Sequence, residues 1–293
     1  ISFSLRSGET LAIVGESGSG KTSFVRAMLG LIPMEAGRAV YAGAPLEGPV
    51  ERRARNQRRD LQLVFQDPVS ALNPQMRVQR IIEESLLVHE PQLSRGERAV
   101  RIVEALEQVG LDEGFLRRFP HELSGGQAQR VAIARALVLG PRVLICDEAV
   151  AALDGSVRER VLKLLQTVQE QTGLAIIFIS HDLAVVRSIS HRVLVMYMGR
   201  LVEIADNASL FSHPRHPYTR ALIDAVPVPD PVIAPKKAPL AGEVPSLLKP
   251  PPGCVFHTRC NYAQQECEIR LPATHDFDGT RVACHRADEI DLT

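Results

Sequence analysis

The sequence predicts an α/β fold built on a largely parallel sheet. Three short apolar runs lie at residues 11–14, 143–146 and 175–179, and helical patterns lie between and around them. Strands of a parallel sheet read as continuous apolar runs because helices cover both faces. A glycine-rich stretch follows the first run, and a helical pattern begins at Lys21 and stops before Pro33. We therefore expect a strand, a glycine loop and a helix in succession near the start.

Two further patterns complete the expected domain. Between Gln66 and Val138 the sequence is mostly helical with polar faces. It predicts a helical insertion carried on the sheet, at about residues 70–138. From Arg192 the stretch RVLVMYMGRLVEI alternates around Gly199, which is typical of a β-hairpin.

Composition and charge exclude several classes of protein. The 293 residues include 34 Lys+Arg and 34 Asp+Glu, so the formal net charge is zero. Zero net charge gives no general attraction to nucleic acid or to an anionic membrane. No apolar run approaches the roughly 18 residues of a membrane span, and the opening at Ile1 carries no secretory signal. Because it lacks an initiator Met, we expect the sequence to begin inside a longer chain.

The composition changes after Val226, where prolines crowd residues 227–252 and exclude regular helix or central strand. We expect one domain at 1–226 and a Pro-rich arm with a cysteine-containing region at 227–293. Four of the five cysteines lie in that region, at Cys254, Cys260, Cys267 and Cys284. The fifth, Cys146, falls inside an apolar strand, which indicates a buried small hydrophobe.

The four late cysteines stand in a segment with little apolar content, so a staple is expected there, although the lack of an export signal argues against a disulfide framework. Their spacing lacks the C-x2-C pairs of ordinary zinc sites. Thiolate ligation of an Fe–S cluster is physically reasonable, zinc is a weaker alternative, and unligated thiols are the third. His257 and His285 could replace a thiol as ligands.

The glycine loop matches G-x-x-x-x-G-K-[ST] between a strand and a helix, the arrangement that binds nucleotide phosphates. Glycines let backbone N–H groups turn toward the phosphates, and the helix N-terminus adds its dipole. Lys21 would reach the β- and γ-phosphates, and the Thr22 hydroxyl would ligate Mg²⁺. The expected phosphate contacts are Gly15, Glu16, Ser17, Gly18, Ser19, Gly20, Lys21 and Thr22.

Two adjacent acids end the second apolar run. Asp147 is expected to hold Mg²⁺ through water, and Glu148 to polarise the attacking water as general base. His181, just past the third run, could donate a hydrogen bond to a γ-phosphate, although a lone His there is more often structural.

A second phosphate-facing element begins a later helix. Ser124 stands at an N-cap, and Gly125, Gly126 and Gln127 follow it. One nucleotide rarely needs two such elements from one chain. We therefore expect this one to complete the γ-phosphate site of a partner molecule.

Together these residues resemble the nucleotide-binding subunit of an ABC transporter. The loop at 15–22, Gln66 in VFQDP, the LSGGQ signature at 123–127, the acids at 147–148, Asp154 of the D-loop and His181 as switch histidine follow the family's order. The motifs DP at 67–68, LNP at 72–74, HPRHPYT at 213–219 and PPGC at 251–254 narrow the resemblance to dipeptide/oligopeptide importer ATPases, especially their second ATPase subunit.

The resemblance implies a P-loop NTPase core of ABC type, a helical signature subdomain and a small Pro/Cys-rich C-terminal extension. It implies a head-to-tail dimer, preferably a heterodimer, in which Lys21 and Thr22 of one subunit and Ser124 and Gly126 of the other enclose ATP. Gln66 would sense Mg²⁺ and the attacking water. Two membrane permease subunits, an extracytoplasmic solute-binding protein and the cytoplasmic face of the inner membrane are also implied, as is a [4Fe-4S] cluster in some relatives.

The chain departs from the family pattern in three ways. Thr22 stands where Ser is commoner, a change that is chemically equivalent for Mg²⁺. Ala149 and Ala151 replace the usual Pro and Ser, which leaves the hydrolysis rate open. The adenine-stacking aromatic of the family lies upstream of residue 1, so we expect the A-loop segment to be missing.

Three other functions remain open from the sequence. The same motor could serve nickel or glutathione uptake, or the chain could be a catalytically weak regulatory subunit. A soluble ABC ATPase acting on ribosomes or DNA is the third. Its best support is the basic run Arg52, Arg53, Arg55, Arg58 and Arg59, although a solvated helix face or a contact to the membrane partner explains that run more simply.

Overall fold

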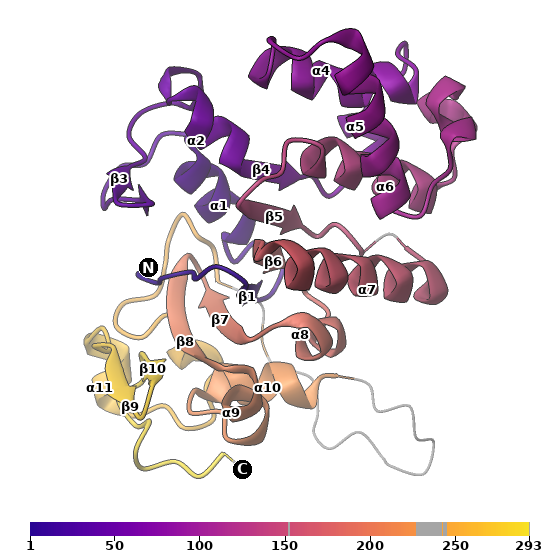
Figure 1. Ribbon diagram of the computed structural model, residues 1–293. Helices are drawn as coiled ribbons and strands as arrows, with labels where there is room; N and C mark the ends of the chain where they lie inside the picture. The colour runs from indigo at the N-terminus through magenta and orange to yellow at the C-terminus, as the bar shows by residue number, and fades with distance from the viewer. Residues whose placement is uncertain (152, 227–241, 243–244, 293) are drawn as a thin grey trace. The chain divides into compact units, whose positions relative to one another are not determined.

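The computed structural model describes residues 1–151, 153–226, 242 and 245–292 (Figure 1). The chain forms two compact units. Unit 1 comprises residues 1–4, 10–24 and 180–293, and unit 2 comprises residues 5–9 and 25–179. Most of the expected Pro-rich arm, at 227–241, lies outside the described residues.

Unit 2 contains three parallel strands in the order β4, β5, β6, namely Leu61–Val64, Val143–Asp147 and Ala175–Ile179. The register pairs Leu61 with Val143 and Val143 with Ala175. Every residue of β6 is buried, as the continuous apolar run predicted. Because parallel strands start and end together, the carboxyl ends of β4 and β5 lie at one edge.

The expected helical insertion is confirmed in unit 2. Helix α6 (Gly125–Leu137) contacts α3, α4 and α5, and eight of its residues are buried (Figure 1). The remaining elements of this part of the chain are α1 Lys21–Leu29, which begins in unit 1, β2 Val40–Tyr41, β3 Ala44–Pro45, η1 Val50–Arg52, α2 Arg55–Asp60, α3 Pro68–Ala71, α4 Val78–His89, α5 Arg95–Gln108, η2 Glu113–Arg117, η3 Pro120–Glu122 and α7 Gly155–Thr172.

Unit 1 is built on a mixed sheet in the order β1, β7, β8, β10, β9. Strands β1 (Thr10–Val14) and β7 (Arg192–Tyr197) are parallel, and β7 pairs antiparallel with β8 (Arg200–Asp206). Gly199, at φ +73°, makes the turn between them, so the predicted hairpin is confirmed.

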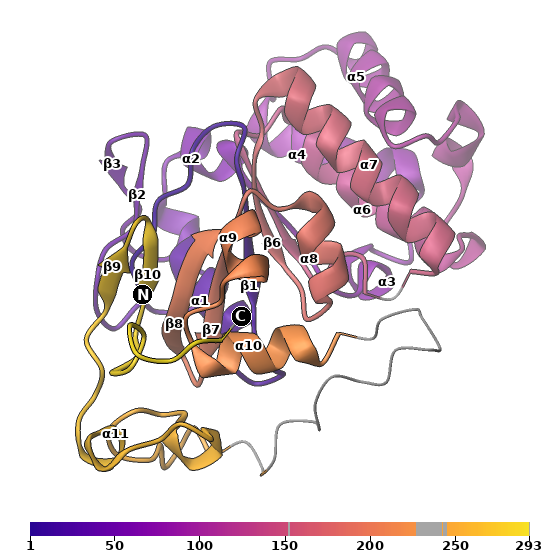
Figure 2. The same cartoon turned by 90° about the horizontal axis from the view of Figure 1, so that it is seen from below.

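The C-terminal region adds two strands that the sequence analysis did not predict, β9 (His275–Phe277) and β10 (Thr280–Val282). Strand β10 pairs antiparallel with β8. Helices α9 and α10 lie against β8 (Figure 2). The other short elements of unit 1 are α8 Leu183–Ile189, α9 Asn207–Ser212, α10 Pro217–Asp224, η4 His257–Arg259 and α11 Gln265–Ile269.

The cysteine-containing region shares the hydrophobic core of unit 1. Cys254, Phe256 and Cys267 are buried with Tyr197 of β7 and Tyr218 of α10. A segment poor in apolar residues is therefore stabilised by packing on the β7–β8 hairpin and α10. Within the described ranges, no helix has both the length and the apolar character needed to cross a bilayer.

Candidate active site

The glycine loop joins β1 directly to α1, as predicted. A Cβ at Gly15 would lie 2.2 Å from the Met196 carbonyl oxygen, so no side chain fits there. Gly18 and Gly20 have φ of +77° and +93°, a conformation that glycine adopts without strain. The glycines of this loop are thus required both by space and by backbone conformation.

Lys21 closes the loop upon itself. Its ammonium group donates to the carbonyl oxygens of Gly15, at 2.8 Å, and Glu16, at 3.0 Å, and to the Ser19 hydroxyl at 3.4 Å. The Gly199 N–H donates to the Ser19 carbonyl oxygen at 2.8 Å, which fastens the loop to the β7–β8 turn. The next residue, Thr22, is the second of α1 and is half-buried. The loop therefore has the geometry of a phosphate-binding element at a helix N-terminus.

The two acids lie where β5 ends. Asp147 is the last strand residue and is 4 % exposed. Glu148 follows with φ of +49°, a conformation uncommon for a residue with a side chain. Its N–H donates to the Ile179 carbonyl oxygen at 3.1 Å. Such strain concentrates at functional sites, and here the turn takes Glu148 out of the strand direction.

Two predicted catalytic residues meet at this edge. Gln66 lies two residues beyond β4 and is exposed. Its side-chain N–H donates to the Glu148 carboxylate at 2.8 Å. The parallel pairing of β4 with β5 brings together residues 82 positions apart.

The LSGGQ segment caps α6. The Ser124 hydroxyl accepts from the Gln127 N–H at 3.3 Å, and the Gln127 side chain accepts from the Ser124 N–H at 2.9 Å. This reciprocal pair is a capping box and confirms the predicted N-cap. Gly125 and Gly126 form the first turn, and a Cβ at Gly126 would lie 2.6 Å from a methyl group of Val157.

Asp154 and His181 occupy loop positions. The Asp154 carboxylate accepts from the Val157 N–H at 2.9 Å and caps α7, and this hydrogen bond lowers the pKa of the carboxyl. His181 is exposed between β6 and α8, as expected for a strand end. Of the altered D-loop, Ala149 is buried, Ala151 is exposed, and residue 152 lies outside the described residues.

Two residues that contact the phosphate loop were missed by sequence reasoning. The Tyr218 hydroxyl accepts from the Glu16 N–H at 2.8 Å, and Arg259 forms an ion pair with the Glu16 carboxylate at 2.7 Å. The HPRHPYT stretch that contains Tyr218 served only as a mark of the family. No local pattern connects Arg259 with a loop 243 residues earlier.

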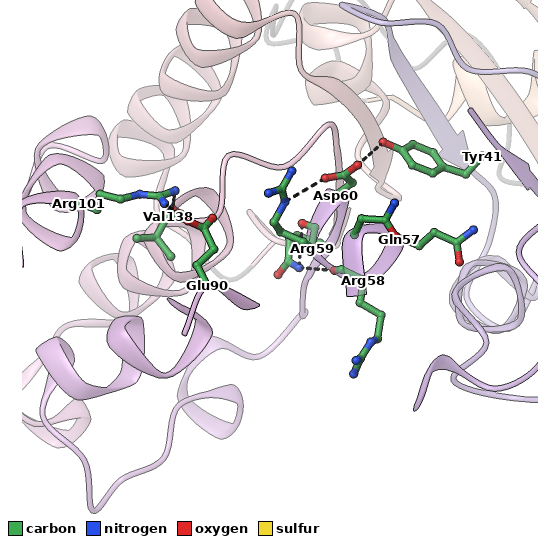
Figure 3. Close-up of polar contacts among 10 residues, drawn as sticks. Tyr41, Gln57, Arg58, Arg59, Asp60, Glu90, Arg101 and Val138 are labelled. Carbon is green, nitrogen blue, oxygen red and sulfur yellow. Dashed lines mark hydrogen bonds and ion pairs between the residues drawn. The ribbon is translucent and has the colours of Figure 1, made fainter. Parts of the chain in front are cut away.

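The basic run does not form one exposed face. Arg53 is 7 % exposed and donates to the carbonyl oxygens of Met28, Leu46 and Gly48. Arg59 pairs with the Asp60 carboxylate, which also accepts from the Tyr41 hydroxyl at 2.8 Å (Figure 3).

The four late cysteines line one pocket together with His257 and His285. Burial raises the pKa of the Cys260 thiol to about 11 and that of the Cys284 thiol to about 12. In the described part of the chain, no three His, Cys, Asp or Glu side chains are placed to hold a metal ion. The pocket thus gathers four thiols without the geometry of a single-ion site.

The loop, the acid pair with Gln66, and the signature define an ABC-type ATPase. Two family models match the chain: ABC transporter over residues 1–151, and the C-terminal region of oligopeptide/dipeptide transporters over residues 202–267.

Curated relatives agree with this assignment. A probable peptide ABC transporter ATP-binding protein, y4tS of Sinorhizobium fredii, is 49% identical over 97% of this chain and 81% of its own length. The oligopeptide transport ATP-binding protein OppF of Escherichia coli is 46% identical over 99% of this chain and 87% of its own.

Solved structures show the same fold. The cbiO1 protein of Clostridium perfringens, part of the transporter complex cbiONQ, has a TM-score of 0.65 and 31% identity over 72% of this chain and 82% of its own. The cassette MJ0796 bound to ADP and Pi has a TM-score of 0.62 and 28% identity over 70% of this chain and 88% of its own. The chain therefore belongs to the ABC transporter family, within the ATP-binding proteins of oligopeptide and dipeptide importers.

Proposed function

We propose that this ATPase hydrolyses ATP with Glu148 as general base, oriented by Gln66, and with His181 at the γ-phosphate. Hydrolysis energises uptake of oligopeptides or dipeptides. The observation that carries the assignment of roles is the 2.8 Å hydrogen bond from the Gln66 side chain to the Glu148 carboxylate. This hydrogen bond orients the carboxylate, and a general base must be oriented within hydrogen-bond reach of the water that it deprotonates.

The glycine loop and Lys21 bind the phosphates of ATP in this proposal. Thr22, Asp147 and Gln66 offer hydroxyl, carboxylate and amide oxygens, the donors that Mg²⁺ prefers. Because Gln66 uses its N–H₂ group on Glu148, its side-chain carbonyl oxygen would be the atom that could ligate Mg²⁺. When bound, Mg²⁺ would neutralise charge on the β- and γ-phosphate oxygens.

The signature serves a second ATPase subunit, which we propose to be a different chain. Ser124, Gly125, Gly126 and Gln127 would close over ATP held by the partner, with Asp154 at the dimer contact. The Ser124 hydroxyl accepts from the Gln127 N–H, so its own proton remains to be donated to a phosphate oxygen. The capping box therefore leaves the Ser124 hydroxyl able to donate a hydrogen bond to phosphate.

The proposed assembly contains two membrane permease subunits and an extracytoplasmic solute-binding protein, with this subunit at the cytoplasmic face of the inner membrane. Nucleic acid is not a partner, a view supported by the inward position of Arg53. We propose residues 1–226 as the ATPase domain, with its helical subdomain at about 70–138, and residues 227–293 as the transporter extension. Peptides are the favoured cargo, and nickel or glutathione are the alternatives.

For the cysteine pocket we propose a [4Fe-4S] cluster rather than zinc. Zinc requires its sulfur ligands within about 2.3 Å of one atom, and the described side chains form no single-ion site. A cluster holds its four thiolates around a larger body, which suits four thiols spread over one pocket. Iron and acid-labile sulfide assays on anaerobically purified protein test this, with Cys260→Ser as control. Stoichiometric zinc, or neither metal, would overturn it.

Uptake into proteoliposomes that contain the complete transporter tests the function. Labelled dipeptide, longer peptide, nickel and glutathione are offered in turn, and Glu148→Gln is the hydrolysis-deficient control. We expect peptide to accumulate with wild-type protein and not with Glu148→Gln. ATP hydrolysis without peptide uptake would contradict the assigned cargo and would direct the search to the other solutes or to ribosomes.

A further inference from the structure

The cysteine-containing segment contacts the phosphate loop through one buried arginine. Arg259, the last residue of η4, donates from Nη1 to Glu16 Oε2 at 2.7 Å and from Nη2 to Glu16 Oε1 at 3.1 Å. The Arg259 side chain is 5 % exposed and the Glu16 side chain 26 %. This is the bidentate arrangement, the strongest and most directional form of a charged hydrogen bond.

Aromatic residues hold the arginine and the loop in place. Arg259 also approaches the Tyr197 hydroxyl at 3.4 Å, and the Tyr218 hydroxyl accepts from the Glu16 N–H at 2.8 Å. The rings of Tyr197, Tyr218 and Phe256 pack with centroids 4.7 to 5.3 Å apart. Because both the backbone and the carboxylate of Glu16 are bound, this residue has little freedom to move.

Glu16 is also hydrogen-bonded to residues of the loop that are expected to bind phosphate. Its carbonyl oxygen accepts from the Lys21 ammonium at 3.0 Å and from the Ser19 N–H at 3.1 Å. The Glu16 hydrogen bond also raises the pKa of Arg259, so the guanidinium stays charged at any physiological pH. A continuous set of contacts thus runs from Arg259 through Glu16 to Lys21.

We propose that Arg259 is a positioning residue for the phosphate loop, through which residues 254–284 set the affinity of this subunit for ATP. The inference rests on the ATP-binding function of the loop. A loop held in its binding conformation before nucleotide arrives loses less freedom on binding. Without the Arg259 clamp the binding-competent loop is only partly populated, and the apparent affinity falls by that fraction.

The coupling is reciprocal. If the folded segment tightens ATP binding by some factor, bound ATP stabilises the folded segment by the same factor. Cys260 follows Arg259 directly in the chain and lines the thiol pocket. The segment then acts on ATP affinity from within the same subunit.

A double-mutant cycle tests the clamp in the assembled transporter. Arg259→Gln and Glu16→Gln should each raise the KM for ATP about five- to tenfold, the low end of measured site-to-site couplings, with kcat within about twofold. The double variant should match either single variant, since both remove one interaction. Arg270→Gln, in the same segment but on a side chain 75% exposed, should change neither constant.

Three outcomes would overturn the proposal: an unchanged KM in folded Arg259→Gln, multiplied effects in the double variant, or an equal effect of Arg270→Gln. If Arg259→Gln does not fold, Arg259→Lys keeps the charge without the fork, and Tyr218→Phe removes the acceptor of the Glu16 N–H. Each should then raise KM. ATP binding by the wild-type protein in the same assay distinguishes failure of the proposed function from failure of the Arg259 proposal. If the wild-type protein did not bind ATP, the proposed function itself would be refuted.

Discussion

The Gln66 side chain donates a 2.8 Å hydrogen bond to the carboxylate of Glu148, across the edge where β4 and β5 end. This bond fixes the rotamer of an acid whose backbone is already constrained at φ +49°. The proposed base is thus positioned twice, once by its own turn and once by its neighbour.

Glu148→Gln should slow ATP hydrolysis strongly and retain ATP binding. The amide is close in size to the carboxylate but cannot accept the proton, so kcat should fall about 10²- to 10⁴-fold. Gln66→Ala leaves the base in place without its orienting partner and should cost less, about tenfold. Steady-state ATPase assays with a separate ATP-binding measurement check both. A Gln66→Ala loss as large as that of Glu148→Gln would mean that Gln66 is itself indispensable.

The two glycines of the signature should respond differently to alanine. Gly126→Ala places a Cβ 2.6 Å from Val157, a stiff β-branched residue of α7, and should destabilise the protein by about 1–3 kcal/mol. A Cβ at Gly125 meets nothing within 4 Å, so Gly125→Ala should be neutral or slightly stabilising. Urea denaturation of the purified chain measures both.

Val157→Ala supplies the control for that comparison. Removing the clashing methyl groups should restore most of the stability lost in Gly126→Ala. Equal denaturation midpoints for Gly125→Ala and Gly126→Ala would contradict the prediction and would show that α7 shifts to accommodate the added methyl group.

His216 should make the fold sensitive to acid. Burial lowers the pKa of His216 to about 3, from 6.5 for an exposed histidine. Between these two pH values the unfolded chain binds a proton that the folded chain does not. Stability should therefore fall as pH decreases below about 6.5, by up to about 1.4 kcal/mol per pH unit from this residue.

A variant comparison isolates this effect, because buried Glu203 acts in the opposite direction: burial raises its carboxyl pKa. Neutral His216 accepts from the Tyr218 N–H at 3.0 Å and caps α10. His216→Asn can keep a capping acceptor without titrating near neutral pH. Its stability should depend less on pH between 7 and 5, whereas exposed His213→Asn should leave the dependence unchanged. Parallel profiles for wild type and His216→Asn would exclude His216 as the source.

The sequence predicted the local structure correctly where that structure depends on contiguous residues. The glycine loop, the strand-end acids and the Ser124 cap each act through neighbours in the chain, so residue type and spacing were enough to predict them. The Gln66–Glu148 contact depends on strand pairing, and neither the motifs nor the family resemblance predicted it. Sequence order alone does not specify which parallel strands become neighbours.

The C-terminal region was predicted least well. Its scarcity of apolar residues suggested a segment that depends on a metal or thiol staple. The structure adds stabilisation by packing that the sequence analysis did not predict, because Phe256 packs on Tyr197 and Tyr218 and β10 extends the sheet through β8. This stabilisation depends on residues that are distant in the sequence, so it cannot be predicted from the local pattern of residues.

Buried Cys146 should react with an alkylating reagent more slowly than half-buried Cys260 and Cys284. Cys146 is 0 % exposed, and burial together with Asp147 raises its pKa to about 12. Cys284 has a similarly raised pKa but is half-buried, so the complete burial of Cys146 inside β5 is what makes its alkylation require unfolding. Cys260 and Cys284 are half-buried and should react slowly in native, metal-depleted protein.

Mass spectrometry after brief iodoacetamide treatment, with and without chelator, separates ligation from burial. Chelator should expose Cys260 and Cys284 while Cys146 stays unmodified in both samples, because its protection comes from packing alone. If Cys146 were alkylated at the rate of the late thiols, β5 would open on the labelling time scale, and the position of Glu148 at its end would be unfixed. Equal labelling of the late thiols in both samples would instead count against a bound cluster.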